Sequence, residues 1–218
     1  MPGERTTEDE STGDMTTGDG GEEGPMRQEN ESGSPRPAPT TAVEPVSQLK
    51  AADLNDLCDA TEAAILDGGG FGWVRPPARE VMERYWKGVL AVPLRTLLVG
   101  RLDGVIVGSI QLVRPPPNNE AQAFAANIAS AFVAPWARGH GLAQSLVMRA
   151  EALAREEKFA AVQLDVRETQ GAAIRLYENL GYQRWGTNPA YALVDGRLLA
   201  GHFFCKMLTS LTDGDRPQ

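Results

Sequence analysis

The chain has 218 residues and a formal charge of −8, a length that allows one medium domain and an additional segment. Residues 1–45 hold eleven Asp or Glu and three Arg, so they carry the whole net charge and the rest is balanced. A balanced domain has no basic surface typical of nucleic-acid binding, so we expect no nucleic-acid partner. Two cysteines and two histidines provide neither a disulfide framework nor a metal-ligand spacing, so we expect no metal.

Residues 1–45 are rich in Gly, Glu, Thr, Ser and Pro and poor in large apolar side chains. Such a segment cannot bury enough apolar area to offset its ordering entropy. We therefore predict a disordered acidic tail over residues 1–45, either an inert solubilising leader or a partner-binding arm, and a folded domain over residues 46–213. Because no signal peptide and no apolar run of about 20 residues is evident, we expect no membrane contact and a cytoplasmic location.

The folded part begins with two predicted helices. Apolar residues recur at helical spacing over residues 51–66, and Asp67 with three following glycines ends that pattern. A second helix is predicted over residues 78–90, after an aromatic, Pro-rich loop. Two strands then follow over residues 95–101 and 105–113, joined by an Asp-Gly pair that is typical of a tight hairpin turn.

A strand, a glycine-containing turn and a helix follow one another between residues 123 and 156. The apolar segment 123–133 runs into Pro135, and a 3.6-residue periodicity starts at Leu142. The first turn of a helix presents unpaired N–H groups and the positive end of the helix dipole. Glycines allow a phosphate to approach the backbone closely. The sequence therefore predicts a diphosphate site at the turn.

The remaining segments again alternate between strand and helix. We predict a strand over residues 161–166, then a helix with Thr169 as N-cap and Gly181 as the residue after its C-cap. Closing strands are predicted over residues 183–185 and 202–208. This order of elements predicts an α/β fold.

Two motifs resemble those of one known family. Arg138, Gly141 and Ala143 match Arg-x-x-Gly-x-Ala, similar to the acetyl-CoA pyrophosphate signature of the GNAT N-acetyltransferase superfamily. The run Leu-Tyr-Glu-Asn-Leu-Gly-Tyr over residues 176–182 resembles the later motif of the same superfamily, and the likeness extends over roughly residues 46–211. It implies a central mixed, mostly antiparallel sheet flanked by helices and splayed by a bulge near Val133.

The resemblance also implies acetyl-CoA as co-substrate and direct transfer of its acetyl group to a primary amine. The pantetheine arm would pair with the backbone of the strand before the signature, and main-chain amides of the turn would hold the pyrophosphate. An ordinary strand–turn–helix junction is the alternative. The implied co-substrate-binding residues are Ala131, Phe132 and Val133 for the arm, Arg138, Gly139, His140, Gly141, Leu142 and Ala143 for the pyrophosphate, and Gln170, which stands where the family often has Asn.

Tyr177 matches the tyrosine that in this family protonates the departing CoA thiolate. A phenol and a thiol have reference pKa values of about 10 and about 8.5, so a positioned phenol can donate a proton to the thiolate. The alternative is a core tyrosine whose hydroxyl is satisfied within the protein. The general base stays open among five candidates, which are Asp165, Glu168, Glu120, Asn127 acting through a water, and Tyr191.

The acceptor is the least determined part of the prediction. A weaker likeness to the tabtoxin-resistance branch implies an amino-acid-like or antibiotic-like small amine. Acetylation of a protein or peptide amine and a non-catalytic acyl-CoA-binding module are the alternatives. We expect specificity to lie in the two N-terminal helices and in loops 68–77, 115–122 and 187–201. The oligomeric state, a homodimer included, stays open.

Overall fold

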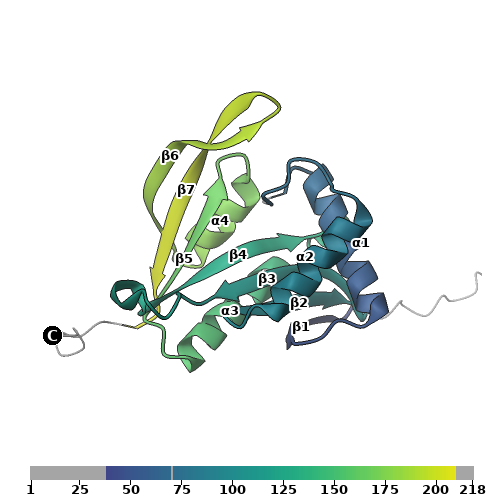
Figure 1. The fold of residues 1–218 in the computed structure, drawn as a ribbon, viewed down its shortest axis with the longest axis horizontal. Helices are drawn as coiled ribbons and strands as arrows, with labels where there is room; N and C mark the ends of the chain where they lie inside the picture. Colours follow the sequence, from purple (N-terminus) through teal and green to yellow (C-terminus); the bar gives the residue numbers. More distant parts are fainter. Residues whose placement is uncertain (1–37, 70, 210–218) are drawn as a thin grey trace, which may run out of the picture. The chain divides into compact units, whose positions relative to one another are not determined.

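The structure is a computed structural model that describes residues 38–69 and 71–209. Within these residues the strands form one sheet in the order β1-β2-β3-β4-β5-β7-β6, antiparallel except between β4 and β5 (Figure 1). This arrangement confirms the mixed, mostly antiparallel sheet flanked by helices. In chain order the elements are β1 Thr41–Val46, α1 Ala51–Leu66, α2 Arg79–Ala91, β2 Arg95–Leu102, β3 Val105–Val113, the 3₁₀ helix η1 Glu120–Gln122, β4 Ala125–Val133, the 3₁₀ helix η2 Pro135–Ala137, α3 Leu142–Glu156, β5 Ala161–Arg167, α4 Gly171–Asn179, β6 Gln183–Val194 and β7 Arg197–Met207.

The two faces of the sheet carry different helices because side chains alternate along each strand. On β2, Leu97 and Val99 pack with α1 and α2, whereas Leu98 between them packs with α3. The first face includes the fully buried Trp86 of α2, and the second includes Leu146 of α3. Figure 1 shows α2 and α3 on opposite sides of the sheet. Each face is therefore covered by its own apolar core.

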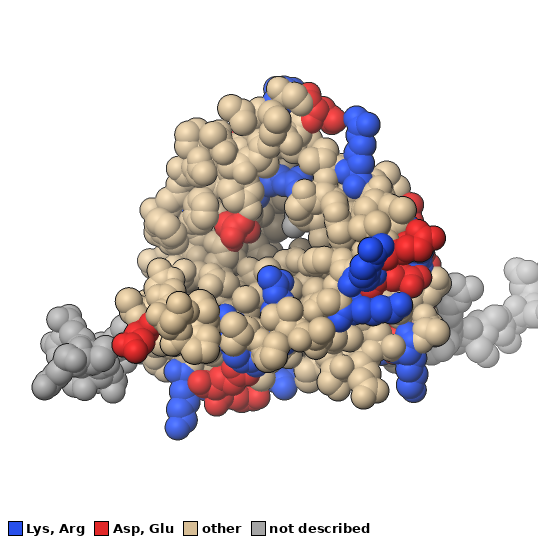
Figure 2. Space-filling view, in the orientation of Figure 1, with Lys and Arg blue, Asp and Glu red and all other residues tan. Residues whose placement is uncertain are grey.

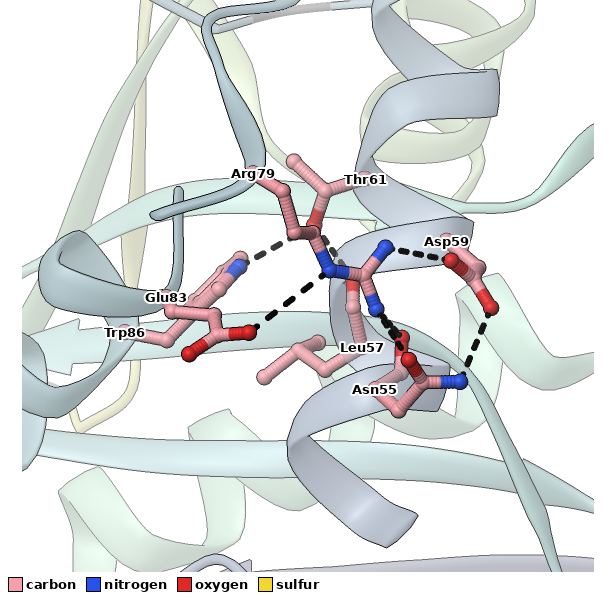
Figure 3. A network of polar contacts seen from close by, with 7 residues as sticks. All are labelled: Asn55, Leu57, Asp59, Thr61, Arg79, Glu83 and Trp86. Atoms are coloured by element: carbon pink, nitrogen blue, oxygen red, sulfur yellow. Dashed lines mark hydrogen bonds and ion pairs between the residues drawn. The ribbon is translucent and has the colours of Figure 1, made fainter. Parts of the chain in front are cut away.

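A polar network fixes α1 against α2 (Figure 3). Arg79, the first residue of α2, forms an ion pair with Asp59 and donates from Nη2 to the main-chain carbonyl of Asn55 at 2.8 Å. The buried indole Nε1 of Trp86 donates to Oγ1 of Thr61 at 3.2 Å. These contacts pair polar groups between the two helices and hold the first residue of α2 against the middle of α1.

β4 contains a bulge opposite β3. Ser109 pairs with Phe132 and Gln111 pairs with Ala129, so β4 has one more residue between these pairs than β3. Ser130 lies in the bulge with φ of +48°, in the left-handed region that costs a non-glycine residue about 1–2 kcal/mol. This confirms the bulge expected near Val133.

The sheet opens between β4 and β5 beyond the bulge. Their parallel pairing covers Ala125–Asn127 against Ala161–Gln163 and stops there. Farther on, β4 continues to pair with β3, and β5 continues to pair with β7. The facing edges, 128–133 of β4 and 164–167 of β5, have no strand between them among the described residues. Backbone groups on these edges are therefore available to an extended ligand.

The predicted boundary between tail and domain at residue 45 is wrong. Residues 41–45 belong to β1, which pairs with β2. Nε of Arg101 donates to Glu44 at 2.8 Å, so an acidic residue assigned to the tail is bound to the sheet. Composition missed this because β1 is an exposed edge strand with few large apolar side chains. Residues 1–37 of the predicted tail and residues 210–213 of the predicted domain lie outside the described residues.

The structure confirms one of the two predicted ends of α4 and corrects the other. The N-cap is Gln170 and its side chain makes no capping bond, so the prediction of Thr169 as N-cap is wrong. Gly181 has φ of +87°, and the amide of Tyr182 donates to the carbonyl of Tyr177 at 3.0 Å. This geometry closes the helix in a Schellman motif and confirms the role of the glycine.

The segment 187–201, expected as a loop, is instead most of the β6–β7 hairpin. The hairpin turns at Asp195 and Gly196, both with positive φ, in the same way as the predicted turn at Asp103 and Gly104. A second Asp-Gly pair marked this turn in the sequence. The segment in which we expected specificity therefore continues the sheet as two paired strands.

Candidate active site

Two cavities lie along the opening between β4 and β5. The hairpin cavity, about 480 Å³, is lined by β4, β5, β6 and part of the loop after α1. The helix cavity, about 460 Å³, is lined by the end of β4 and by α3 and α4 near their N-termini. Ala131, Gln170, Ala173 and Tyr177 line both cavities. Figure 2 shows a hollow in the middle of this face, with acidic and basic side chains at its rim.

The turn before α3 has the conformation that an anion site needs. Gly139 and Gly141 have φ of +86° and +75°, and a Cβ added to either would meet no atom within 4 Å. The first backbone bond of α3 joins the amide of Ser145 to the carbonyl of Gly141 at 3.0 Å. The amides of residues 139–144 have no protein acceptor among the described residues. Free N–H groups, open space and the positive end of a 15-residue helix therefore coincide here.

The structure separates the predicted co-substrate residues into two groups. Those that line the helix cavity are Ala131, Phe132, Val133, Arg138, Ala143 and Gln170. Gly139, His140 and Gly141 form the adjoining turn, where Nδ1 of His140 lies 3.2 Å from the carbonyl of Ala137. The side chain of Leu142 is buried in the core, so only its backbone faces the turn.

Arg138 and Gln170 are both engaged by the end of α1. Nη2 of Arg138 lies 2.6 Å from the Asp67 carboxylate, and both side chains are partly exposed. Nε2 of Gln170 donates to the main-chain carbonyl of Gly68. The two contacts join the end of α1 to the η2–α3 turn and to α4. Oε1 of Gln170 takes part in neither contact.

Tyr177 lies at the junction of the two cavities. Its side chain is 6% exposed, and its hydroxyl makes no hydrogen bond with the described residues. Burial, and then the negative charge of Asp165, raise the pKa of Tyr177 to about 12. The phenol is therefore protonated throughout the physiological pH range. Tyr177 also belongs to the apolar core beside α3, so its role as proton donor stays a prediction.

Of the five candidate bases, two lie together in the hairpin cavity. The Tyr191 hydroxyl donates to the Asp165 carboxylate, and both residues line the cavity. Burial and this hydrogen bond raise the pKa of Tyr191 to about 12. Glu168 accepts instead from the amide of Ala200 at 2.8 Å, outside the cavity. Glu120 in η1 and Asn127, where β4 still pairs with β5, do not line the cavity either.

Two residues of the site were missed from the sequence. Arg167, at the end of β5, is 9% exposed and lines the hairpin cavity. Ser130 lines the same cavity from the bulge of β4. The signal for Arg167 was its place two residues after Asp165, on the same face of the strand. Ser130 had no sequence signal because a non-glycine residue with positive φ is fixed by tertiary contacts.

Two further observations concern the described residues. Residues 38–69 and 71–209 contain no group of three His, Cys, Asp or Glu side chains placed to hold a metal ion. The expectation of a metal-free reaction stays a prediction. None of the described helices is both long enough and apolar enough to cross a bilayer.

Comparison of the sequence with known families gives one match. The acetyltransferase (GNAT) family profile matches residues 60–182, which include the turn before α3 and the Tyr177 motif. A curated relative from Azospirillum brasilense, named "Uncharacterized N-acetyltransferase in hisH-hisA intergenic region", is 64% identical over 128 residues. That alignment covers 59% of this chain and 76% of the relative.

Solved structures share the fold at low sequence identity. A GNAT superfamily phosphinothricin acetyltransferase from Sinorhizobium meliloti, in complex with AcCoA, has a TM-score of 0.65 and 19% identity, covering 81% of this chain and 97% of that one. A ribosomal-protein-alanine N-acetyltransferase from Brucella melitensis has a TM-score of 0.65 and 21% identity, covering 76% and 99%. The chain belongs to the acetyltransferase (GNAT) family and is an acyltransferase of the N-acetyltransferase type.

Proposed function

We propose that this N-acetyltransferase moves the acetyl group of acetyl-CoA directly to the primary amine of a small, amino-acid-like or antibiotic-like molecule in the cytoplasm. The observation that carries the proposal is the meeting of the two cavities at Tyr177. One cavity adjoins the anion site of α3, and the other holds the Asp165–Tyr191 pair. A donor in the first and an acceptor in the second would bring their reacting atoms together at the junction.

The residues present fit acetyl-CoA. A diphosphate accepts hydrogen bonds from the free amides of residues 139–144, where the two glycines leave room for it. The amide groups of a pantetheine arm pair with the free edge of β4 around Ala131, Phe132 and Val133. An arm bound in this way would bring the thioester next to Tyr177, which lines the same cavity as Ala131. Acetyl-CoA supplies the activated acetyl group, and the protein supplies its position.

The transfer forms one C–N bond and breaks one C–S bond. The amine nitrogen attacks the carbonyl carbon and loses a proton toward the Asp165 carboxylate, directly or through water. The thiolate leaves and takes the phenolic proton of Tyr177. Burial disfavours the phenolate and the thiolate alike. It raises the pKa of Tyr177 to about 12, and it would also raise the pKa of a thiol that leaves in the same cavity. The phenol then regains a proton from solvent before the next cycle.

The hairpin cavity supports a small acceptor. Its volume of about 480 Å³ lies within the range of about 300–1,000 Å³ that is typical of small-molecule sites. Tyr191 and the strand that follows it, up to Val194, line the cavity on the hairpin side. Because β6 continues the sheet as part of a hairpin, it limits the space that a folded protein or a long peptide would need.

The experiment is a thiol-release assay with acetyl-CoA and a panel of amines, combined with calorimetry of acetyl-CoA binding. We expect binding of acetyl-CoA and release of CoA with at least one small primary amine. Turnover with lysine-containing or N-terminal peptides alone would favour the peptide N-acetyltransferase. Binding without release for any amine or peptide would favour the non-catalytic acyl-CoA module, and no binding would contradict the proposal outright. A chain that lacks residues 1–37 should match the full chain in both assays.

A further inference from the structure

Arg167 is a buried cation without an acidic partner. It is nine-tenths buried, and its Nη2 donates a hydrogen bond to the main-chain carbonyl of Phe71. Among the described residues it forms no ion pair with a carboxylate. Buried charges in proteins are ordinarily paired, because removing an ion from water is costly. The other donors of this guanidinium therefore need an acceptor that the described part of the chain does not supply.

Glu151 is a buried charged residue that, unlike Arg167, has partners of opposite charge. Glu151 is 3% exposed and is bound by Lys206 at 2.7 Å and by Arg155 at 3.3 Å. That charge is neutralised within the fold and lies outside both cavities. Arg167, by comparison, lines the hairpin cavity. The unpaired charge thus lies where a ligand can reach it.

The position of Arg167 separates it from the phosphates of acetyl-CoA. It lines the hairpin cavity and not the helix cavity, where the turn before α3 supplies the anion site. It lies on the same strand face as Asp165, two residues away, which corresponds to about 6.6 Å along a strand. A small amino-carboxylic acid can span that distance, with its amine toward Asp165 and its carboxylate toward Arg167. Arg is the side chain best suited to bind a carboxylate in this way.

We propose that the acceptor is an amino-carboxylic acid whose carboxylate binds Arg167, which makes this arginine a specificity-determining residue. The inference rests on the proposed function and deepens it, because it names the chemical class of the acceptor. The carboxylate would accept from the guanidinium donors that are not bound to Phe71. The bond to Phe71 would continue to hold the loop after α1 against the cavity.

The test compares matched triads in the acetylation assay: an amino acid, its primary amide and its decarboxylated amine, for aliphatic, aromatic and acidic side chains. Rates are expressed per concentration of free-base amine, because the three compounds differ in amine pKa. We expect kcat/KM for the best amino acid to exceed that of its amide about 10- to 100-fold, since a hydrogen-bonded charge pair is lost. The difference should lie mainly in KM.

Arg167→Gln should reduce this preference to within a few-fold of unity, and Arg167→Lys should restore part of it. Arg184→Gln is the matched control, because Arg184 is exposed on β6 and lines neither cavity. Acetyl-CoA affinity and the melting temperature of each variant report any purely structural effect. Equal use of acids and amides by the unsubstituted enzyme, or a preference that survives in Arg167→Gln, would overturn the inference and leave the proposed function intact. No turnover of any amine would remove both.

Discussion

The hydroxyl of Tyr85 lies 3.1 Å from Oγ of Ser130, and this contact joins α2 to the bulge of β4. Nη1 of Arg95 donates to Oε1 of Gln111 at 2.7 Å, and Nε2 of Gln111 donates to the Tyr85 oxygen at 3.1 Å. Because Tyr85 accepts from Gln111, its own proton is free to go to Ser130. A chain of hydrogen bonds thus holds a left-handed residue at the edge of the candidate active site.

Tyr85→Phe should weaken catalysis through this chain. It leaves the amide of Gln111 without its partner and frees Ser130, so the edge of β4 that positions the thioester becomes less well fixed. We expect kcat/KM to fall about 5- to 30-fold, the equivalent of about 1–2 kcal/mol. As a backbone control, Ser130→Gly keeps the left-handed conformation at low cost, whereas Ser130→Ala does not. Equal activities of these two variants would show that the conformation is unimportant.

Tyr177 and Tyr182 form a matched pair for the proton-donor role. Their rings lie 5.6 Å apart and both are buried, but Tyr182 lines neither cavity, and its hydroxyl has no hydrogen-bond partner within residues 38–69 and 71–209. Tyr182→Phe should leave turnover unchanged and raise stability by up to about 1 kcal/mol, because an unsatisfied polar group is removed. Tyr177→Phe should lower kcat about 10²- to 10⁴-fold without loss of acetyl-CoA binding. Comparable turnover in both variants would exclude Tyr177 as the acid.

Gly141 and Gly104 form a second matched pair. Both have positive φ, and a Cβ at either would meet no atom within 4 Å. Alanine should therefore cost about 1–2 kcal/mol of stability at each position. Gly141→Ala should in addition raise the Kd for acetyl-CoA at least about 10-fold, because its methyl group occupies the space assigned to the diphosphate. Calorimetry that finds the same Kd in both variants would contradict the anion site at α3.

The ring of Tyr191 packs directly on Gly201, since a Cβ there would lie 2.1 Å from its Cγ. Gly201→Ala should displace this ring and separate Tyr191 from Asp165. We expect a larger loss of kcat/KM than of melting temperature, and Tyr191→Phe should reproduce it. Gly186→Ala in the same hairpin is the control, because a Cβ at that position meets no atom. Full activity of Gly201→Ala would show that the Tyr191–Asp165 contact is dispensable.

The tyrosine ionisations predict how stability depends on pH. The pKa of Tyr177 is raised to about 12 in the folded protein, from about 10 in an unfolded chain. The unfolded chain releases this proton first, so the contribution to stability is complete below pH 10 and is lost as the pH rises to 12. Between pH 9 and pH 11, the free energy of unfolding measured with denaturant should fall by about 1 kcal/mol because of Tyr177. Tyr177→Phe should show a drop smaller by that amount, and identical drops would contradict the assignment.

Much of the fold could be predicted from the sequence because the patterns that determine it are local. The stripe that begins at Leu142, the Asp103-Gly104 turn and the glycine after α4 are each determined by a few neighbouring residues, and the structure confirms them. β1 was missed because pairing with β2, rather than its own composition, holds it in the sheet. The length of the β6–β7 hairpin was missed although Asp195-Gly196 marked its turn.

Residues of the candidate site could be predicted from the sequence only where they belong to a motif. The turn before α3 and Tyr177 stand in recognisable runs, so their positions could be assigned from the family resemblance. The choice of Asp165 and Tyr191 among the candidate bases required the packing of the closing hairpin on β5. Arg167 has no carboxylate partner among the described residues because of where the fold places the acidic side chains. A sequence pattern does not show those positions.

The opening between β4 and β5 has a consequence for the stability of the enzyme in the cell. An acyl donor bound as proposed, along the free edge of β4, would bridge this opening. A ligand that binds only the native state raises the free energy of unfolding by about 2.7 kcal/mol at a hundred times its Kd. Nutrient conditions that deplete the acyl donor would therefore expose the protein to proteases sooner.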